Sequence, residues 1–240
     1  MTITFHPLGD RAIQLVFSNK ISKQTIQKIK SYTTLLESES IQGLIEWIPA
    51  YTTLTILYDP AIIQYEELVE MLNQIKVKEA SEVPQSFIYE LPICYGGDFG
   101  PDLSYVASYH SLTEDEVINI HSSRDYFIYM IGFAPGFPYL GGMSIKISTP
   151  RLDRPRKKVA AGSVGIAGEQ TGIYPLDSPG GWRIIGRTPI PLYNPNNEQP
   201  ILLSPGNYLR FKPISLQQFY DIKKQNENGT YEITKYSKEE

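Results

Sequence analysis

Two short stretches that are rich in proline or glycine contain five arginines, and four of these are candidates for chemistry. Arg151 and Arg154 belong to the run TPRLDRPRKK, whereas Arg183 and Arg187 belong to the run SPGGWRIIGRTP. A guanidinium group binds a carboxylate or a phosphate through paired hydrogen bonds, and a loop stiffened by proline would hold it in place. We therefore expect these arginines to be catalytic, because they can stabilise negative charge as it develops on a reacting group. The alternative is that both runs are solvated loops whose arginines make surface ion pairs.

The second run also predicts a short strand. In a regular extended chain, Arg183 and Arg187 point to the same side, about 13 Å apart, while Trp182 and Ile184 point to the other side. One face of this strand would then belong to the core. The other face would present two aligned guanidinium groups beside a glycine turn, which suits the binding of an anion.

A third stretch, GFAPGFPYLGG, predicts a rigid aromatic loop. Its prolines fix φ, and its glycines allow positive φ or the close approach of another backbone. Phe133, Pro135, Phe137 and Tyr139 would supply an apolar wall for a small ligand, so we expect them to bind substrate. The alternative is a tight corner of a barrel, in which these aromatic rings plug one end.

A fourth stretch, AGSVGIAGEQTGIYP, predicts a short strand followed by a polar turn. Gln170 and Thr171 would project from this turn, where their side chains can form hydrogen bonds with an amide or a lactam. Together with Tyr174 they complete the expected set of substrate-binding residues. The alternative is a polar hairpin tip that binds nothing.

Other kinds of site find little support. The chain contains neither a GxxxxGK[ST] phosphate loop nor a GxGxxG fingerprint. His6, His110 and His121 lie outside the glycine-rich stretches and lack a spacing typical of metal ligands, so we expect no metal site. We expect each histidine to be a surface side chain or a structurally bonded one. The single cysteine, Cys94, excludes an internal disulfide and a cysteine-built metal cluster.

Composition is that of a globular protein with a sizeable core. Of the 240 residues, 41% are hydrophobic, and the formal net charge of −4 argues against nucleic acid as a partner. No apolar run approaches the ~20 residues of a membrane-spanning helix, and the N-terminus does not resemble a signal peptide. We therefore expect a cytoplasmic protein with no membrane or nucleic-acid partner.

The elements that would position these residues predict an α+β protein with two domains. Residues 1–82 combine helical and strand periodicity, with Ser22 preceding the first helix, and predict a small ferredoxin-like domain. The polar run VKEASEVPQS marks the boundary. Residues 83–240 predict short strands in a closed or nearly closed β-barrel, with a capped helix beginning at Thr113. We expect the polar tail from about residue 225 to be loosely ordered.

Long runs of the sequence resemble one protein family. The runs GFAPGFPYLGG, TPRLDRPRKKVAAGSVGIAG, QTGIYPLDSPGGWRIIGRTP and SPGNYLRF are similar to those of KipI, the 5-oxoprolinase B subunit and allophanate hydrolase subunit 1. PLGDRAI near the start fits as well, so the resemblance covers nearly the whole chain. It implies that the C-terminal barrel is cyclophilin-like. It does not imply prolyl isomerase activity, because a fold alone carries no function.

The resemblance also implies a reaction and partners. It implies the B subunit of an ATP-dependent 5-oxoprolinase complex, which converts 5-oxoproline to L-glutamate and is inactive without its other subunits. The implied partners are the A and C subunits of 5-oxoprolinase, the latter of the allophanate hydrolase subunit 2 type, and the implied cofactor is ATP with Mg²⁺, shared with a partner. Two alternatives stay open: a KipI-type inhibitor of histidine kinase autophosphorylation, and subunit 1 of an allophanate hydrolase or urea carboxylase. This chain has no AMKM-like segment for biotin attachment.

Overall fold

The structure, a computed structural model, describes residues 3–75 and 85–238. The chain divides into two compact units, Met1–Gln85 and Ser86–Glu240. The domain boundary expected between residues 82 and 83 lies outside the described residues. Within the described ranges, no helix combines the length and the apolar character that crossing a membrane requires.

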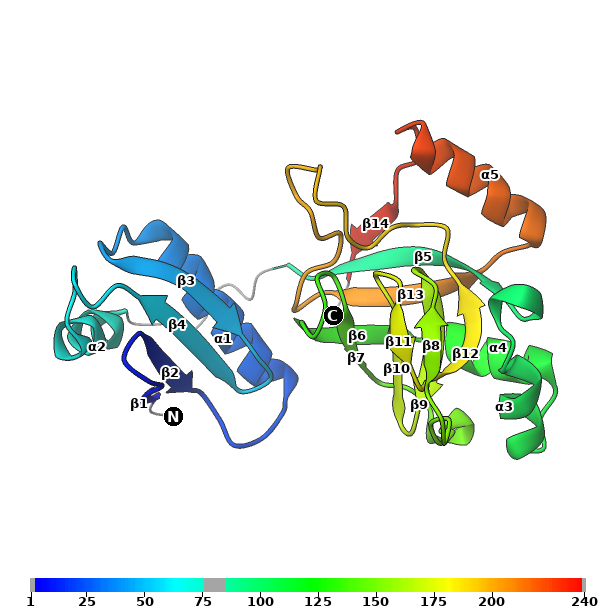
Figure 1. Ribbon diagram of the computed structural model, residues 1–240, viewed down its shortest axis with the longest axis horizontal. Coiled ribbons are helices and arrows are strands. Elements are labelled where there is room, and N and C mark those ends of the chain that lie inside the picture. The colour runs from blue at the N-terminus through cyan, green and yellow to red at the C-terminus, as the bar shows by residue number, and fades with distance from the viewer. Residues whose placement is uncertain (1–2, 76–84, 239–240) are drawn as a thin grey trace. The chain divides into compact units, whose positions relative to one another are not determined.

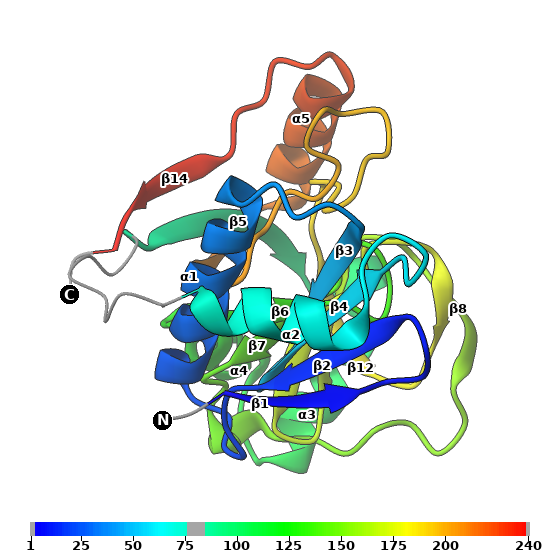
Figure 2. The same cartoon turned by 90° about the vertical axis from the view of Figure 1, so that its left-hand side faces the viewer.

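The N-terminal unit is a four-stranded antiparallel sheet, in the order β1-β2-β4-β3, with two helices packed on it (Figure 2). Ile13 and Leu15 of β2 are buried in one cluster with Tyr32 of α1 and Leu72 of α2. The Tyr32 hydroxyl donates to the Leu72 carbonyl oxygen at 2.7 Å, which ties the two helices together. Ser22 caps α1, as predicted. The elements are β1 (Thr4–Pro7), β2 (Ala12–Val16), α1 (Lys23–Ser38), β3 (Leu44–Pro49), β4 (Thr53–Tyr58) and α2 (Tyr65–Gln74).

The C-terminal unit is built on an eight-stranded sheet that curls into a nearly closed barrel (Figure 1). The strand order is β10-β9-β12-β5-β13-β6-β7, and β14 also pairs with β5. The end strands β7 and β10 lie beside each other, but no hydrogen-bonded ladder joins them among the described residues. The strands are β5 (Phe87–Tyr95), β6 (Asp125–Ile131), β7 (Pro138–Gly141), β9 (Ser163–Ala167), β10 (Gln170–Ile173), β12 (Arg183–Arg187), β13 (Tyr208–Pro213) and β14 (Thr234–Ser237).

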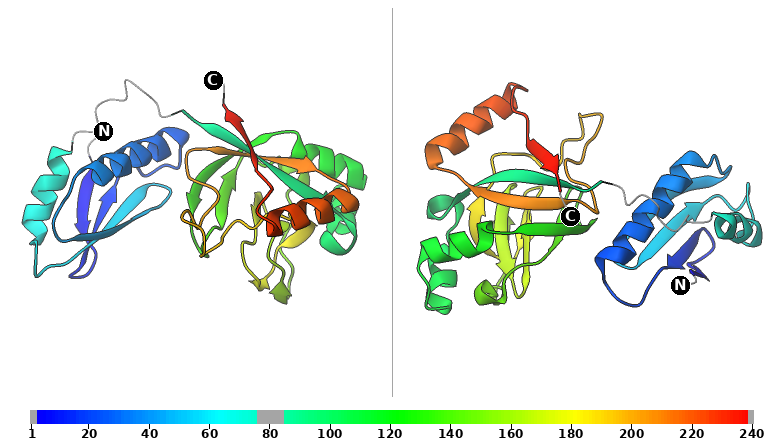
Figure 3. Two further views of the ribbon diagram at one scale, coloured as in Figure 1. Left: turned by 90° about the horizontal axis from the view of Figure 1, so that it is seen from above. Right: turned by 180° about the vertical axis from the view of Figure 1, so that it is seen from behind.

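The remaining elements of this unit flank the barrel. Strands β8 (Arg156–Val159) and β11 (Ser178–Gly180) pair with each other in a separate small sheet. The helices are α3 (Leu103–Tyr109), α4 (Glu114–Ser122) and α5 (Leu216–Glu227). Helix α5 lies along β5, apart from the α3–α4 pair (Figure 3). The predicted mixture of helices with a nearly closed barrel is confirmed, whereas the ferredoxin-like and cyclophilin-like descriptions stay predictions.

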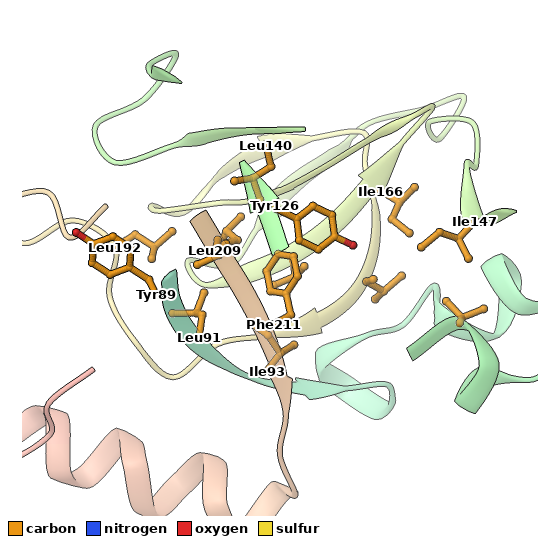
Figure 4. Packing of buried hydrophobic residues seen from close by; sticks show 14 of the residues in the cluster. Tyr89, Leu91, Ile93, Tyr126, Leu140, Ile147, Ile166, Leu192, Leu209 and Phe211 are labelled. Atoms are coloured by element: carbon orange, nitrogen blue, oxygen red, sulfur yellow. The ribbon is translucent and has the colours of Figure 1, made fainter. Parts of the chain in front are cut away.

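The barrel core is centred on β5 and β13, which run parallel to each other (Figure 4). Leu91 and Ile93 of β5 are fully buried, and Tyr126 of β6 meets Phe211 of β13 edge to face, with ring centroids 5.1 Å apart. Helix α4 covers this part of the core, because its buried His121 stacks on Phe211 with centroids 4.4 Å apart.

Side-chain caps begin two of these helices. Thr113 and Glu116 form the predicted capping box at the start of α4. Ser215 and Gln218 form a second capping box at the start of α5. Each box satisfies backbone N–H groups that have no partner inside the helix, so the start of each helix is fixed locally.

The end of the chain is more ordered than its composition predicts. Residues 234–237 form β14, which pairs antiparallel with residues 87–90 of β5. The Lys238 ammonium lies 2.6 Å from the carboxylate of Asp125, which also binds Arg210 at 2.6 Å. The expectation of a loosely ordered tail is corrected here, because backbone pairing along an open strand edge does not require apolar side chains.

Candidate functional site

A cavity of about 330 Å³ opens beside the seam between β7 and β10. All four proline- and glycine-rich stretches contribute to it, so these loops meet at one cavity. Six predicted site residues line the cavity, namely Phe133, Phe137, Tyr139, Arg151, Gln170 and Tyr174. The other lining residues are Pro155, Pro179, Gly180, Gly181 and Trp182. We call this space the aromatic cavity.

Aromatic rings form one wall of the aromatic cavity. The buried Phe137 meets Tyr139 and Trp182 edge to face, with centroid distances of 5.3 Å and 5.9 Å. Gly172 of β10 makes room for this packing, since a Cβ there would lie 3.0 Å from the Trp182 ring and 3.2 Å from that of Phe137. Phe133 is 80% exposed at the rim and has a φ of +66°, which is strained for a residue other than glycine.

Trp182 was not among the predicted substrate-binding residues, and its backbone is fixed by a partly buried ion pair. Arg156 donates from Nη1 to the Trp182 carbonyl oxygen at 3.2 Å and from Nη2 to the Asp102 carboxylate at 2.8 Å. The second oxygen of Asp102 accepts a hydrogen bond of 2.6 Å from the Ile184 backbone N–H. Asp102 is only 7% exposed, so this pair holds the strand on both sides of Arg183.

The polar groups of the aromatic cavity are few. Arg151 is the one cation in its lining, and its guanidinium carbon lies 5.9 Å from the centroid of the Trp182 ring. Gln170 is exposed and offers both a donor and an acceptor through its amide. Burial raises the pKa of Tyr174, offset in part by a backbone hydrogen bond with Trp182, so this phenol stays protonated at neutral pH. The lining therefore combines one positive charge, one amide and the two phenols of Tyr139 and Tyr174, with no carboxylate.

The four predicted catalytic arginines do not share one site. Arg151 lines the aromatic cavity, and Arg187 lines a second cavity in the same unit. Arg154 is exposed, and neither it nor Arg183 belongs to the lining of either cavity. The structure thus corrects the expectation that all four arginines act on one reacting group, and of the four only Arg151 lines the aromatic cavity.

A β-bulge in β12 explains why the expected alignment of Arg183 and Arg187 is wrong. Arg183 pairs with Ile166 of β9 and Arg187 pairs with Ser163, and the register shifts between them. Positions three residues apart on β9 lie on opposite faces, so the two arginines leave β12 on opposite sides. Arg183 accordingly lies over the ring of Tyr105, with its guanidinium carbon 3.7 Å from the centroid.

Two predicted substrate-binding residues lie outside the lining of the aromatic cavity. Thr171 is 1% exposed, and its hydroxyl donates to the Gly165 carbonyl oxygen at 3.0 Å while it lies 2.8 Å from His121 Nε2. Its hydrogen-bonding capacity is therefore used inside the barrel. Pro135 is exposed on the aromatic loop and does not line the cavity.

His121 is a structurally bonded side chain, as expected. Its Nδ1 lies 2.7 Å from the Tyr95 hydroxyl, and because Thr171 donates to Gly165, the tautomer protonated at Nε2 satisfies every partner. Burial, with a smaller contribution from the positive charge of Arg124, lowers the pKa of His121 to about 3, so the ring is neutral. Across the part of the chain that the structure describes, no group of three or more His, Cys, Asp or Glu side chains could hold a metal ion.

Comparison with known proteins identifies relatives over nearly the full length of the chain. The family model described as carboxyltransferase domain, subdomain C and D, matches residues 3–203. The chain is 40% identical over 240 residues to the 5-oxoprolinase B subunit of Bacillus subtilis (strain 168), covering 94% of this chain and 100% of that one. It is 44% identical over 207 residues to the 5-oxoprolinase B subunit of Escherichia coli O157:H7, covering 86% and 94%.

A solved structure shows the same fold in a much larger protein. The crystal structure of the K. lactis urea amidolyase matches with a TM-score of 0.76 at 20% identity, and it covers 98% of this chain. This chain spans only 16% of that protein, and at such low identity the likeness concerns the fold alone. On the family match and the close relatives, the chain belongs to the family of carboxyltransferase-domain subdomains C and D, together with the proteins named as the B subunit of 5-oxoprolinase.

Proposed function

We propose that this chain is the B subunit of an ATP-dependent 5-oxoprolinase complex, which converts 5-oxoproline to L-glutamate. The observation that carries this proposal is the content of the aromatic cavity, where one cation, one carboxamide and several rings surround about 330 Å³. 5-Oxoproline is a five-membered lactam that bears one carboxylate, so it presents one group to each of these partners. The names of the relatives from Bacillus subtilis and Escherichia coli support the same reading.

In this proposal each lining group has one role. Arg151 binds the carboxylate of the substrate through its guanidinium group. The Gln170 amide pairs with the lactam, accepting from the ring N–H and donating to the ring carbonyl. Phe137, Tyr139 and Trp182 cover the methylene groups of the ring and exclude water from it.

The proposed reaction requires activation, because a five-membered lactam is a stable amide. Phosphorylation of the lactam oxygen by ATP would convert that oxygen into a leaving group, and negative charge would develop there. Arg151 is the one cation in the cavity lining, and the substrate carboxylate occupies it. The groups that stabilise the developing charge would therefore come from partner subunits and from Mg²⁺ bound with ATP. This division of roles supports the proposal that the chain is inactive without the A and C subunits.

The other readings have less support. A KipI-type inhibitor of a histidine kinase would need a docking face, and the concave aromatic cavity fits a small ligand better. The proposal of subunit 1 of an allophanate hydrolase or urea carboxylase is supported by the fold of the urea amidolyase. That protein is 20% identical to this chain, whereas the 5-oxoprolinase B subunit of Bacillus subtilis is 40% identical. We also propose that the N-terminal unit is ferredoxin-like, since β4 lies between β2 and β3, and that the C-terminal unit is cyclophilin-like.

Reconstitution tests the proposed function. The chain is combined with the A and C subunits of 5-oxoprolinase, and glutamate release from 5-oxoproline is measured with and without ATP and Mg²⁺. We expect release from the full mixture with ATP, and none when this chain, either partner or ATP is left out. A full mixture that hydrolyses no 5-oxoproline, or that works equally well without this chain, contradicts the proposal.

A further inference from the structure

A second cavity, of about 360 Å³, lies in the C-terminal unit between α5 and the end of β12. The two glycine-rich stretches that contain Gly162 and Arg187 form one side, and Phe219 and Lys223 of α5 belong to the other. None of its lining residues belongs to the aromatic cavity. We call this space the α5 cavity, and the proposed function so far assigns it no role.

Arg187 is held in a fixed orientation in the α5 cavity. Its Nε donates to the Ala161 carbonyl oxygen at 2.8 Å, and its guanidinium carbon lies 5.8 Å from the centroid of the Phe99 ring. Arg187 makes no further hydrogen bond and no ion pair with the residues that the structure describes. Both terminal Nη groups of this half-buried guanidinium therefore remain available to a ligand as paired donors.

A second cation reaches the α5 cavity from the helix. Lys223 lines it, and the nearest carboxylate is that of Glu227, at 3.9 Å one turn further along α5. This pair is loose, because both side chains are more than half exposed. The lining thus carries two cations and one acid, an excess of positive charge at a place where Arg187 already offers directed donors.

Aromatic rings lie next to these cations. Phe99 and Phe219 pack against each other with centroids 4.3 Å apart, which anchors α5 beside the cavity. Tyr220 follows on the helix, lines the cavity and is 53% exposed, so part of its ring is accessible to a ligand. Rings beside paired cations suit a ligand that joins an oxyanion to a planar ring system.

We propose that the α5 cavity binds a nucleoside phosphate, with the phosphate on Arg187 and Lys223 and the base against Tyr220. The choice of a nucleoside triphosphate rests on the proposed function, which consumes ATP, whereas the oxyanion site rests on the geometry alone. Side-chain cations would hold the phosphate here, which agrees with the absence of a phosphate-loop motif from the sequence. Tyr174 lines the aromatic cavity and Pro175 lines the α5 cavity, so the two sites border consecutive residues of the chain.

Isothermal titration of the chain without partners tests this site. The probes are ATP, inorganic tripolyphosphate and adenosine, so that the contributions of phosphate and base are separated. We expect ATP to bind most tightly, tripolyphosphate more weakly and adenosine weakest. Replacing Arg187 by Gln should weaken ATP binding by about tenfold or more, because a paired charge-assisted contact is lost. Lys223→Gln should weaken it by about threefold, and Glu227→Gln should strengthen it slightly.

Matched variants separate this site from unspecific attraction to positive charge. Lys224→Gln removes the neighbouring charge of the same helix, which does not line the cavity, and should leave ATP affinity unchanged. Arg187→Lys keeps the charge but not the paired donors, so it should retain only part of the affinity. Each variant is accepted once its thermal unfolding matches that of the parent chain.

Three results would overturn the proposal. The first is no binding of ATP or tripolyphosphate at millimolar concentration. The second is an ATP affinity that is unchanged by Arg187→Gln, and the third is an affinity that falls with Arg151→Gln instead. None of these results depends on turnover, so the α5 site can fail while the reconstituted complex hydrolyses 5-oxoproline, and the reverse also holds.

Discussion

The guanidinium group of Arg156 donates a hydrogen bond of 3.2 Å to the carbonyl oxygen of Trp182, whose ring forms part of the wall of the aromatic cavity. The same guanidinium group binds the buried Asp102 carboxylate at 2.8 Å. A lysine at this position can keep the ion pair, but it cannot reach both partners with one rigid fork. Arg156 therefore connects the position of the Trp182 backbone to a buried charge.

This relationship predicts that Arg156→Lys shifts Trp182 without unfolding the chain. In a Trp47→Phe background, Trp182 is the one remaining tryptophan, and its emission should shift. In the reconstituted complex we expect KM for 5-oxoproline to rise by about threefold or more while kcat changes little, because binding geometry is affected rather than chemistry.

Arg210→Lys is the matched control, since Arg210 forms a similar ion pair with Asp125 and neither residue lines the cavity. It should leave Trp182 emission and KM unchanged. If both variants raise KM equally, loss of stability rather than positioning explains the effect.

The proposed role of Arg151 predicts a selective loss of substrate affinity. Arg151→Gln removes the one cation of the aromatic cavity and should weaken 5-oxoproline binding by about tenfold or more. Quenching of Trp182 in the Trp47→Phe background measures this affinity directly, because Arg151 lies near that ring and the proposed ligand would lie beside it. Lys157→Gln removes a charge from the same stretch outside the lining and should have no effect. Equal affinities for the Arg151 and Lys157 variants would refute the assignment.

The lining of the aromatic cavity was largely predictable because glycine and proline restrict the backbone there. Phe137, Tyr139 and Gln170 stand in stretches that permit few conformations, and these stretches meet at the cavity. Trp182 stands in such a stretch as well, but strand alternation assigned it to the core. The high content of glycine and proline that marked the other lining residues could also have identified Trp182 as one of them.

Other features depend on contacts that no local pattern shows. Asp102 and Arg156 are 54 positions apart, and their pairing exists only once the fold brings the start of α3 beside β8. The bulge that separates Arg183 from Arg187 has one local sign, because Gly186 in a strand interior favours an irregular ladder. The register itself is set by pairing with β9. An analysis that assumes strict alternation of side chains along one strand cannot predict that register.

The packing around Gly172 predicts that a small substitution damages the aromatic cavity. A Cβ at this position would lie 3.0 Å from the Trp182 ring and 3.2 Å from the Phe137 ring, both of which are held by their neighbours. We expect Gly172→Ala to lower the free energy of unfolding by about 1–3 kcal/mol, as overpacking usually does. Urea denaturation measures the change.

Gly181→Ala is the control for this prediction. The nearest atom to a Cβ at Gly181 lies at 3.6 Å, an ordinary contact distance, so the free energy of unfolding should change by less than about 0.5 kcal/mol. A similar loss for both variants would mean that these stretches need glycine for a reason other than space, and the steric account of Gly172 would not stand.

The pairing of Asp125 with Arg210 and Lys238 predicts how stability depends on pH. Burial alone would raise the pKa of Asp125, but hydrogen bonds and charges from both partners outweigh it and hold the pKa below its ordinary value of 3.8. A carboxyl whose pKa is lower in the folded chain contributes stability that is fully present above the unfolded pKa and is lost as pH falls through the folded pKa. At neutral pH, Asp125→Asn should therefore lower the free energy of unfolding by about 1–3 kcal/mol, a modest value because both partners remain about one-third exposed. As pH falls below 3.8, the difference between variant and parent in urea denaturation should shrink, since the parent carboxyl becomes protonated, and a difference that stays constant as pH falls would show that charge pairing is not its cause.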